Sequence, residues 1–356
     1  MPSARPGAAE SITRELADGA ARRVMVRTVT GLEELAADVL TSAGHQVIDT
    51  SKRQLVVVPA DASIVTDPPR LADDLFLVGA TLPDRGRTKA DLAGLARALR
   101  RRLDVPLRPR PGEDFAVSAS FLGRRTYSRF DVEDLVGAVI AERTAVTYRS
   151  RRDGSPPAAR LDWRVVCDGT TVHVGVRPFD LPLHRRDWRR RTVVGSLHPP
   201  LAAALARLAR IEAGHRVLDP FCGSGTLLLE AGQIQPAARC VGIDRDPEAI
   251  LAARANTPDH TYVEWRVGDA GRLGGPSATV DRIVTNPPWE VRLGLGDIAV
   301  HTREWRRVLR RDGLAVAILN SRQAQVLVAD PAWRVEEVRE VSIAGLHPRI
   351  VVARPR

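Results

Sequence analysis

The stretch RVLDPFCGSGTLLLEAG, residues 216–232, has the pattern of a β-strand, a glycine-rich turn and a helix. Gly223 and Gly225 allow the backbone of that turn to bend tightly and to approach a ligand closely. Asp219 ends the strand, and in α/β folds ligands bind in the crevice outside the carboxyl ends of the strands. The stretch predicts a ligand-binding βα unit, although a glycine-rich turn alone is equally compatible with a tight loop that binds nothing.

The same alternation continues through the C-terminal half of the chain. Short apolar β-runs alternate with helical patterns, and the runs are RVLD, CVGID, YVEWRV, RIVTN and LAVAIL. This alternation is typical of an α/β fold with a mostly parallel, doubly wound sheet. Two further β-runs, RVEEVREVSI and RIVVAR, have no helix between them, and we expect them to close the sheet as an antiparallel edge pair.

Acidic residues at the ends of the next β-runs indicate a nucleoside cofactor, although each acid alone could equally cap a helix. Asp244 follows Asp219 by 25 residues, at a position where an acid commonly binds ribose hydroxyls. Asp269 ends the third run and can meet an adenine amino group. The turn FCGSGT lacks the G-x-G-x-x-G spacing of a dinucleotide site, and Asp219 suits the amino group of a zwitterion. We predict S-adenosylmethionine, bound by Asp219, Phe221, Gly223, Ser224, Gly225, Thr226, Asp244, Arg245, Asp269, Ala270 and Asn286.

The sequence NPPW, residues 286–289, follows the fourth β-run and supplies the predicted catalytic residues. The exocyclic amino group of a base is a poor nucleophile because its lone pair is delocalised into the ring. The Asn286 side-chain oxygen and the Pro287 carbonyl can hold its N–H groups so that the lone pair faces a methyl donor. Pro288 adds rigidity, and Trp289 can stack on the base. The alternative is a Pro-Pro turn beside a core tryptophan.

The net charge favours a polyanionic partner. The chain of 356 residues has a formal net charge of +10, and arginine supplies nearly all of its cations. A basic surface suits nucleic acid, although a GC-rich genome also favours arginine over lysine. The connector LPLHRRDWRRRT, residues 181–192, places arginines around a tryptophan, which suits phosphate contact but also an ordinary solvated face. The residues predicted to contact RNA are Arg124, Arg125, Arg129, Arg185, Arg186, Trp188, Arg189, Arg190 and Arg191.

The front half of the chain has a different pattern. Residues up to about Phe179 alternate between strand-like and helix-like runs and predict two compact α+β pieces. Within them, LADDLFLVGA, residues 71–80, is expected to be helical. Residues 1–22 are rich in alanine, proline, serine and charge, and we expect a flexible tail there.

Composition excludes several classes of protein. No apolar run approaches the ~18 residues of a membrane span, and the first residues lack the apolar core of a secretory signal. The spacing of Cys167, Cys222 and Cys240 fits neither a zinc site nor a disulfide framework. We therefore expect a cytoplasmic protein with no membrane association, no metal and no obligate protein partner.

Three motifs carry a family resemblance. DPFCGSGT, GIDRDPEAILAARAN and NPPW match, in that order, the cofactor, ribose and catalytic motifs of the Rossmann-like amino-methyltransferases, although that catalytic motif more often ends in tyrosine than in Trp289. More narrowly, the chain resembles the THUMP-domain RNA guanine-N2 methyltransferases. This second likeness lies in GLEELAADVLTSAG with LADDLFLVGA, in FAVSASFLGRRTYSRFDVEDLVGAVIAERT, and in PLHRRDWRRR.

The resemblance implies a domain order and a substrate. It implies a flexible tail (1–22), a ferredoxin-like domain (23–82), a THUMP domain (83–180), an arginine-rich linker (181–196) and a Rossmann-like methyltransferase domain (197–356). It further implies methylation of the N2 amino group of a guanosine in tRNA, with the acceptor stem and 3′ end held by the front half. Ribosomal RNA as substrate, a DNA amino-methyltransferase, and a non-catalytic RNA-binding protein remain the alternatives.

Overall fold

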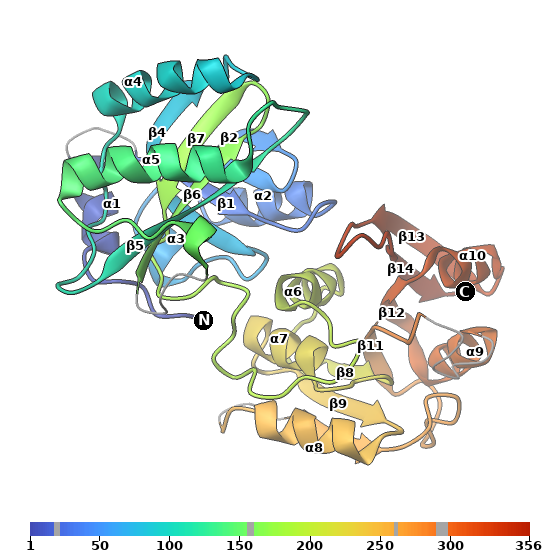
Figure 1. Cartoon of the computed structure of the whole chain (residues 1–356). Helices are drawn as coiled ribbons and strands as arrows, with labels where there is room; N and C mark the ends of the chain where they lie inside the picture. The colour runs from blue at the N-terminus through green and yellow to red at the C-terminus, as the bar shows by residue number, and fades with distance from the viewer. Residues whose placement is uncertain (18–21, 155–159, 260–262, 290–297) are drawn as a thin grey trace. The chain divides into compact units, whose positions relative to one another are not determined.

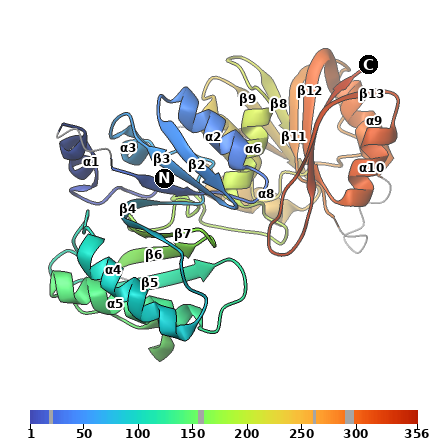
Figure 2. The same cartoon turned by 90° about the horizontal axis from the view of Figure 1, so that it is seen from above.

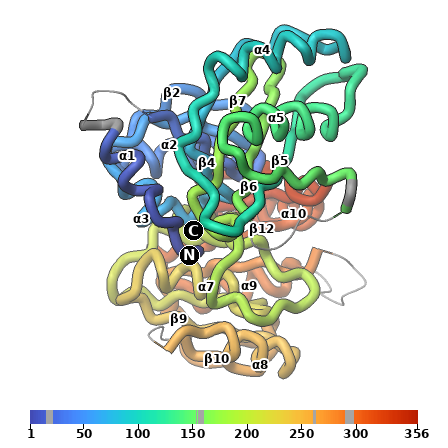
Figure 3. The backbone as a smooth tube through the Cα atoms, turned by 60° about the vertical axis from the view of Figure 1, so that its left-hand side comes forward, coloured from blue at the N-terminus to red at the C-terminus, as the bar shows by residue number. Residues whose placement is uncertain are grey.

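The computed structural model describes residues 1–17, 22–154, 160–259, 263–289 and 298–356 of the chain (Figure 3). The chain divides into two compact units: an N-terminal unit of residues 1–28 and 36–183, and a C-terminal unit of residues 29–35 and 184–356. Each unit is built on its own sheet of seven strands (Figure 1). Among the described residues, no helix combines the length and the apolar character that crossing a membrane requires.

The sheet of the C-terminal unit has the order β10-β9-β8-β11-β12-β14-β13. The pairs from β10 to β12 are parallel, whereas β14 pairs antiparallel with both β12 and β13. This arrangement confirms the predicted parallel sheet with an antiparallel edge pair. The strands are β8 (Arg216–Asp219), β9 (Arg239–Asp244), β10 (Val263–Val267), β11 (Val280–Thr285), β12 (Leu309–Leu319), β13 (Trp333–Glu340) and β14 (Arg349–Pro355).

Helices cover both faces of this sheet, and α6 and α9 lie on opposite sides of it (Figure 2). Two prolines open α6, which suits the first turn of a helix because their missing N–H groups would have no intrahelical partner there. Large apolar side chains, including Trp305 and Trp333, fill the core beside β12 and β14. The helices are α6 (Pro199–Leu208), α7 (Thr226–Ile234), α8 (Pro247–Asn256), α9 (Ile298–Val308) and α10 (Ser321–Ala329).

The strand order creates the position of a ligand site. β8 lies between β9 and β11, so the chain leaves β8 toward one side and later returns on the other. In open α/β sheets this reversal opens a crevice at the carboxyl ends of the two strands. Asp219 ends β8 and Thr285 ends β11, so both residues lie at this crevice.

The N-terminal unit has the strand order β2-β3-β1-β4-β7-β6-β5, in which only β5 and β6 pair in parallel. Helices α4 and α5 run beside one another on it (Figure 1). Its strands are β1 (Val24–Arg27), β2 (Gln46–Ser51), β3 (Gln54–Val58), β4 (Asp74–Pro83), β5 (Asp114–Phe121), β6 (Arg160–Cys167) and β7 (Thr171–Val176). Its helices are α1 (Ala8–Ala17), α2 (Glu33–Ser42), α3 (Ser63–Thr66), α4 (Leu92–Arg102), α5 (Arg129–Thr144) and the 3-10 turns η1 (Lys89–Asp91) and η2 (Arg151–Asp153). The first residues of α2, up to residue 35, are assigned to the C-terminal unit.

Residues 71–80 form most of β4, so the helix predicted there is wrong. β4 pairs with β1 on one side and β7 on the other, and its residues are buried from Asp74 to Ala80. A strand covered on both faces has a continuous apolar run instead of an alternating one, and a short run of that kind is easily mistaken for a buried helix. The predicted domain boundary at residues 82 and 83 falls at the end of β4. The two predicted front domains would thus share one sheet, and their division stays a prediction.

The first residues are held more firmly than the flexible tail that the composition suggested. Ala8 and Ile12 on α1 are fully buried. The guanidinium of Arg5 donates to the Glu113 carboxylate at 2.8 Å and to the Arg160 carbonyl at 2.7 Å. Burial of these groups fixes the segment, and composition did not predict it because the partners lie more than 100 residues away. Residues 18–21 of the predicted tail lie outside the described residues.

Candidate active site

The glycine-rich turn is shaped by an indole ring. Gly225 has φ +87°, and a Cβ there would lie 2.6 Å from Cη2 of Trp265. A Cβ on Gly242 of β9 would lie 2.4 Å from the same ring. Trp265 is fixed by its Nε1–H, which donates to the Thr257 hydroxyl at 2.9 Å. Only glycine fits at both positions, so the turn and β9 can approach the ring closely and α7 can start at Thr226.

Asp219 is a buried carboxyl group that joins β8 to β11. It is 1% exposed, and its Oδ1 accepts hydrogen bonds from the Thr285 hydroxyl at 2.8 Å and the Phe221 N–H at 3.1 Å. Burial raises the pKa of Asp219 to about 7, the two hydrogen bonds oppose the rise, and the Asp244 carboxylate adds to it. In the described part of the chain no cation lies beside this carboxyl, so a ligand ammonium would stabilise it as the carboxylate.

Asp244 ends β9, as predicted, whereas Asp269 lies two residues after the end of β10. One Asp244 oxygen accepts from the Gly223 N–H at 2.9 Å, and the other accepts from the Asp246 N–H at 3.0 Å. Asp244 therefore faces the glycine turn and keeps lone pairs for further donors. Asp269 is exposed and accepts from the Gly271 N–H at 2.8 Å. Arg245 is exposed and Ala270 is buried. Asp246 caps α8 by accepting from the Glu248 N–H, as helix-capping chemistry predicts.

Asn286 follows β11 directly. Its Nδ2 donates to the Gly195 carbonyl at 3.1 Å. Its Oδ1 is buried and has no hydrogen-bond partner within the described part of the chain. A buried carbonyl oxygen without a donor is costly, because about 1–3 kcal/mol of desolvation is not recovered. Such an acceptor at the mouth of the crevice is suited to an incoming N–H donor.

The Pro-Pro turn is held rigidly by α10. Gln323 donates to the Pro288 carbonyl at 2.7 Å, and Asn320 donates to the Trp289 carbonyl at 2.6 Å. The indole N–H of Trp289 donates to the Ile318 carbonyl at 3.2 Å, which fixes its ring plane. The carbonyl groups of Pro288 and Trp289 are thus occupied, and the Pro287 carbonyl belongs to the same turn. Tryptophan serves here as a partly exposed, anchored ring, not as a core residue.

Sequence reasoning missed the residues that join the connector to the site. Asn256, the last residue of α8, is 1% exposed and uses its whole amide. Its Oδ1 accepts from the Arg190 and Arg191 N–H groups, and its Nδ2 donates to the Arg191 and Ser224 carbonyls. The Ser196 hydroxyl lies 2.9 Å from that of Ser224. Connector residues 190–196 thus lie against the glycine turn and Asn286. The only local signal was a polar residue at the end of an otherwise apolar helix face.

The predicted RNA-contacting residues of the connector separate into two groups. Arg185, Arg190 and Arg191 are exposed and Arg189 is partly buried. Arg186 instead forms an ion pair with Glu230 at 2.7 Å, in which both side chains are 0% exposed, and Trp188 is 9% exposed. Arg186 and Trp188 are therefore core residues, and the prediction that these two side chains contact RNA is wrong. A segment rich in arginine is exposed on average, but its sequence does not show which of its arginines pairs with a buried carboxylate.

The arginines predicted on the N-terminal unit separate in the same way. Arg124 and Arg129 are exposed, and the Arg129 guanidinium lies 4.7 Å from the ring centroid of Phe130. The Arg125 side chain is 1% exposed and pairs with Asp84. It also donates to the Gly86 carbonyl at 2.8 Å and the Tyr127 hydroxyl at 2.6 Å. Arg125 therefore stabilises the unit and has no free face for phosphate.

The residues present fit an S-adenosylmethionine site on three observations. Among the described residues, the buried Asp219 carboxyl has no cationic partner and the buried hydroxyl of Thr226 has no hydrogen-bond partner, while Asp244 faces the glycine turn. Burial and the nearby Asp219 raise the pKa of the Cys222 thiol in the turn, so it stays protonated and supplies no nucleophile.

Comparison with known proteins agrees with this geometry. Residues 186–349 match the RMKL-like methyltransferase domain. A tRNA (guanine(6)-N2)-methyltransferase of Thermus thermophilus is 34% identical over 246 residues, which are 67% of this chain and 71% of that protein. The chain belongs to the family of S-adenosylmethionine-dependent tRNA guanine-N2 methyltransferases. The predicted family, fold, enzyme class and cofactor are thereby confirmed.

Two further relatives place the methyltransferase within this family. The crystal structure of TrmN from Thermus thermophilus, 29% identical, matches with a TM-score of 0.80 over 94% of the methyltransferase and 100% of that chain. The human U6 snRNA (guanine-N(2))-methyltransferase THUMPD2 is 34% identical over 151 residues, 41% of the methyltransferase and 29% of that protein. The likeness therefore extends over both units for TrmN and over a shorter stretch for THUMPD2.

Proposed function

We propose that the enzyme methylates the N2 amino group of one guanosine in the acceptor stem of tRNA, at position 6. The observation that carries the proposal is the buried Asn286 Oδ1, an acceptor that lacks a donor among the described residues. The position is taken from two relatives named tRNA (guanine(6)-N2)-methyltransferases, from Thermus thermophilus and Archaeoglobus fulgidus, which align over 67% and 68% of this chain.

In this proposal Asn286 and Pro287 orient the nucleophile. The two N2 hydrogens donate to the Asn286 Oδ1 and the Pro287 carbonyl, which turns the nitrogen lone pair out of conjugation with the ring. The guanine ring stacks on Trp289, whose plane is fixed by its hydrogen bond to Ile318. The bound cofactor supplies an electrophilic methyl carbon on a sulfonium, so that no strong base is needed. After transfer, the substituted nitrogen releases one proton to water.

The cofactor residues have separate roles in the proposal. Asp219, as a carboxylate, holds an ammonium group, and Asp244 accepts from ribose hydroxyls. Asp269 accepts from the adenine amino group, with Ala270 beside it. The backbone of Phe221, Gly223, Ser224 and Gly225 with Thr226 forms the floor, and Arg245 lines its edge.

The N-terminal unit is proposed to hold the tRNA. The predicted ferredoxin-like and THUMP domains would bind the acceptor stem and 3′ end, and exposed arginines would contact phosphates. Arg124 and Arg129 on this unit and Arg185, Arg190 and Arg191 on the connector are the candidates that the structure leaves exposed. A tRNA held by its end would present one guanosine to Asn286 at a fixed distance.

The test is methylation of tRNA transcripts by the full-length enzyme, with the product nucleosides identified by mass spectrometry. We expect N2-methylguanosine in the wild-type transcript and none when guanosine 6 is replaced by adenosine. A transcript trimmed at its 3′ end should be methylated more slowly. Methylation that persists without guanosine 6 would contradict the assigned position, and activity on ribosomal RNA or duplex DNA but not on tRNA would contradict the substrate.

The role of Asn286 is tested separately. Asn286→Ala should lose turnover by at least about 100-fold, the effect of removing one oriented polar group in a catalytic site. Binding of S-adenosylhomocysteine, measured by calorimetry, should remain. The comparison variant is Asn320→Ala, which removes the hydrogen bond to the Trp289 carbonyl but keeps the Asn286 acceptor, so it should lose less turnover than Asn286→Ala. Near-normal turnover by Asn286→Ala would disprove the amino-group mechanism.

A further inference from the structure

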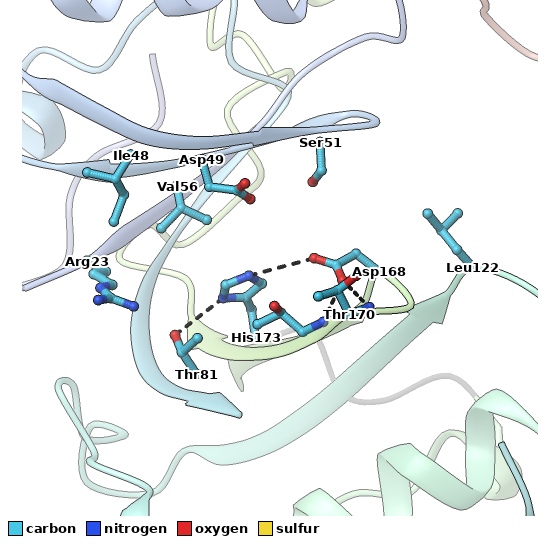
Figure 4. A pocket seen from close by; sticks show the side chains of 11 residues that line it. Arg23, Ile48, Asp49, Ser51, Val56, Thr81, Leu122, Asp168, Thr170 and His173 are labelled. Carbon is cyan, nitrogen blue, oxygen red and sulfur yellow. Dashed lines mark hydrogen bonds and ion pairs between the residues drawn. The ribbon is translucent and has the colours of Figure 1, made fainter. Parts of the chain in front are cut away.

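A second cluster of chemically active side chains lies in the N-terminal unit, away from the methyl-transfer residues. A cavity of about 670 Å³ is lined by residues of β2, β3, β4 and β7 together with the turn between β6 and β7. One ligand atom each from Asp49, Asp168 and His173 falls within 4.8 Å of the other two. Figure 4 shows the three side chains around this cavity, with Thr81 and Asp168 on opposite sides of the imidazole.

The imidazole of His173 is held in one orientation. His173 is 4% exposed and lies opposite Thr81 in the β4–β7 pair. The Thr81 hydroxyl is 3.3 Å from Nδ1, while Nε2 lies 3.9 Å from Oδ2 of Asp168, too far for a hydrogen bond. In the tautomer in which Nδ1–H donates to the Thr81 hydroxyl, Nε2 keeps its lone pair, as in metal-binding histidines whose second nitrogen is oriented by an outer partner.

Asp168 presents a single oxygen in the same direction. Its Oδ1 accepts from the N–H groups of Thr170 at 2.8 Å and Thr171 at 2.6 Å. These two bonds belong to the turn and occupy that oxygen. Oδ2, the oxygen beside His173, has no hydrogen bond among the described residues. The carboxylate is therefore oriented before any ligand arrives.

Irregularities in two strands bring the remaining groups to this cavity. The register of β2 against β3 shifts between Val47 and Asp49, so that Asp49 lies opposite Val56, which also lines the cavity. A one-residue shift moves the following side chains to the other face of a strand. The register of β4 against β7 also shifts, between Val78 and Ala80, which places Thr81 opposite His173. Both shifts direct polar side chains to one place.

We propose that Asp49, Asp168 and His173 bind a divalent transition-metal ion such as Zn²⁺. One imidazole nitrogen and two carboxylate oxygens form a donor set that suits Zn²⁺ or Mn²⁺, and Asp49, the exposed member of the three, is free to adjust its side chain toward an ion. The ion would connect β2 to the β6–β7 turn within the N-terminal unit. The cysteine spacing led us to expect no metal. The spacing of these three ligands gives no such signal either, because they are separated by up to 124 residues in the sequence.

The test uses the full-length enzyme without an affinity tag. The enzyme is first treated with EDTA, the EDTA is removed, and Zn²⁺ is then titrated into it in a calorimeter. We expect one ion per chain. Asp49→Asn, a change on an exposed side chain, should weaken binding by more than about tenfold, as should His173→Gln. Thr81→Val should weaken binding by a similar factor because the imidazole loses its orienting partner. Thermal unfolding with and without Zn²⁺ should show a shift in wild type that is absent from Asp49→Asn.

The matched control is His347→Gln in the C-terminal unit. His347 is a 63% exposed side chain 4.0 Å from the Glu340 carboxylate, so it represents adventitious binding to a surface histidine and acid. This variant should bind Zn²⁺ as wild type does. Titration with Co²⁺ should give no thiolate-to-metal charge-transfer band, since no cysteine is in the donor set. Undiminished binding by Asp49→Asn, loss of binding by His347→Gln, a thiolate band, or no binding by wild type would each overturn the proposal.

Discussion

Replacing Arg186 by alanine is the sharpest test of how the connector is built. The Arg186 Nε donates to a Glu230 carboxylate oxygen at 2.7 Å, and both side chains are 0% exposed. Glu230 lies on α7, the helix that begins at the glycine turn. Removal of Arg186 leaves a buried carboxylate without its cation. We therefore expect a loss of stability in the C-terminal unit and only an indirect effect on RNA binding.

The magnitude follows from the complete burial of the pair. Breaking one side of a buried ion pair costs about 3–5 kcal/mol, while a domain is stable by only about 5–15 kcal/mol. With a urea dependence of roughly 3 kcal/mol per M, the midpoint of unfolding should fall by at least about 1 M. Tryptophan fluorescence is a suitable signal, because five of the six tryptophans lie in the C-terminal unit.

Two further variants separate stability from phosphate contact. Arg186→Met combined with Glu230→Leu removes both charges, and its free energy of unfolding should return to within about 1 kcal/mol of that of wild type. Arg185→Ala, on the exposed neighbour, should leave the midpoint unchanged and weaken tRNA binding, more so at low salt. A wild-type midpoint for Arg186→Ala, together with a loss of tRNA affinity equal to that of Arg185→Ala, would refute the reasoning.

Three other predictions concern the methyltransferase site. Asp244→Ala should weaken binding of S-adenosylhomocysteine by roughly 1–3 kcal/mol in calorimetry, because ribose hydroxyls lose their acceptor, and unchanged affinity in the folded variant would exclude that role. Burial raises the pKa of Asp219 to about 7, so the folded enzyme without cofactor keeps this carboxyl protonated up to neutral pH. Because the folded state binds this proton more tightly than the unfolded state, the contribution of Asp219 to stability is fully present below its unfolded pKa and is lost as the pH rises to about 7. An ammonium binds the ionised form, so cofactor affinity should rise with pH and level off above about pH 7, whereas Asp219→Asn should show weak, pH-independent binding; an unchanged profile in that variant would show that another group titrates. Trp289→Ala should slow methylation while Trp289→Tyr largely restores it, because stacking requires only a flat aromatic face; equal rates for both would remove the stacking role.

The local motifs of the C-terminal unit could be predicted because their function depends on short-range geometry. A strand, a glycine turn and a helix are contiguous in the chain, so the position of Asp219 at a sheet edge follows from the sequence around it. The same holds for Asp244 and for Asn286, each of which directly ends a β-run. The reason that Gly225 must be glycine was not predictable, since the ring of Trp265 comes from a strand 40 residues later.

The connector shows why the remaining site residues could not be predicted. Asn256 reaches Arg190 and Arg191 across about 65 residues of sequence, and Asn286 reaches Gly195 across 91. Nothing in the intervening sequence encodes these pairs, because they form only after α8 and the sheet have placed the groups side by side. These long-range pairs connect the arginine-rich connector to the glycine turn and to Asn286. The Asn256 amide that holds the connector also donates to the Ser224 carbonyl of the glycine turn, and the Gly195 carbonyl of the connector accepts from the Asn286 amide. Movement of residues 190–196 would therefore shift the glycine turn and Asn286 together. The exposed connector arginines, Arg190 and Arg191, are proposed to contact tRNA, so their binding could change the geometry of the methyl-transfer site through these hydrogen bonds.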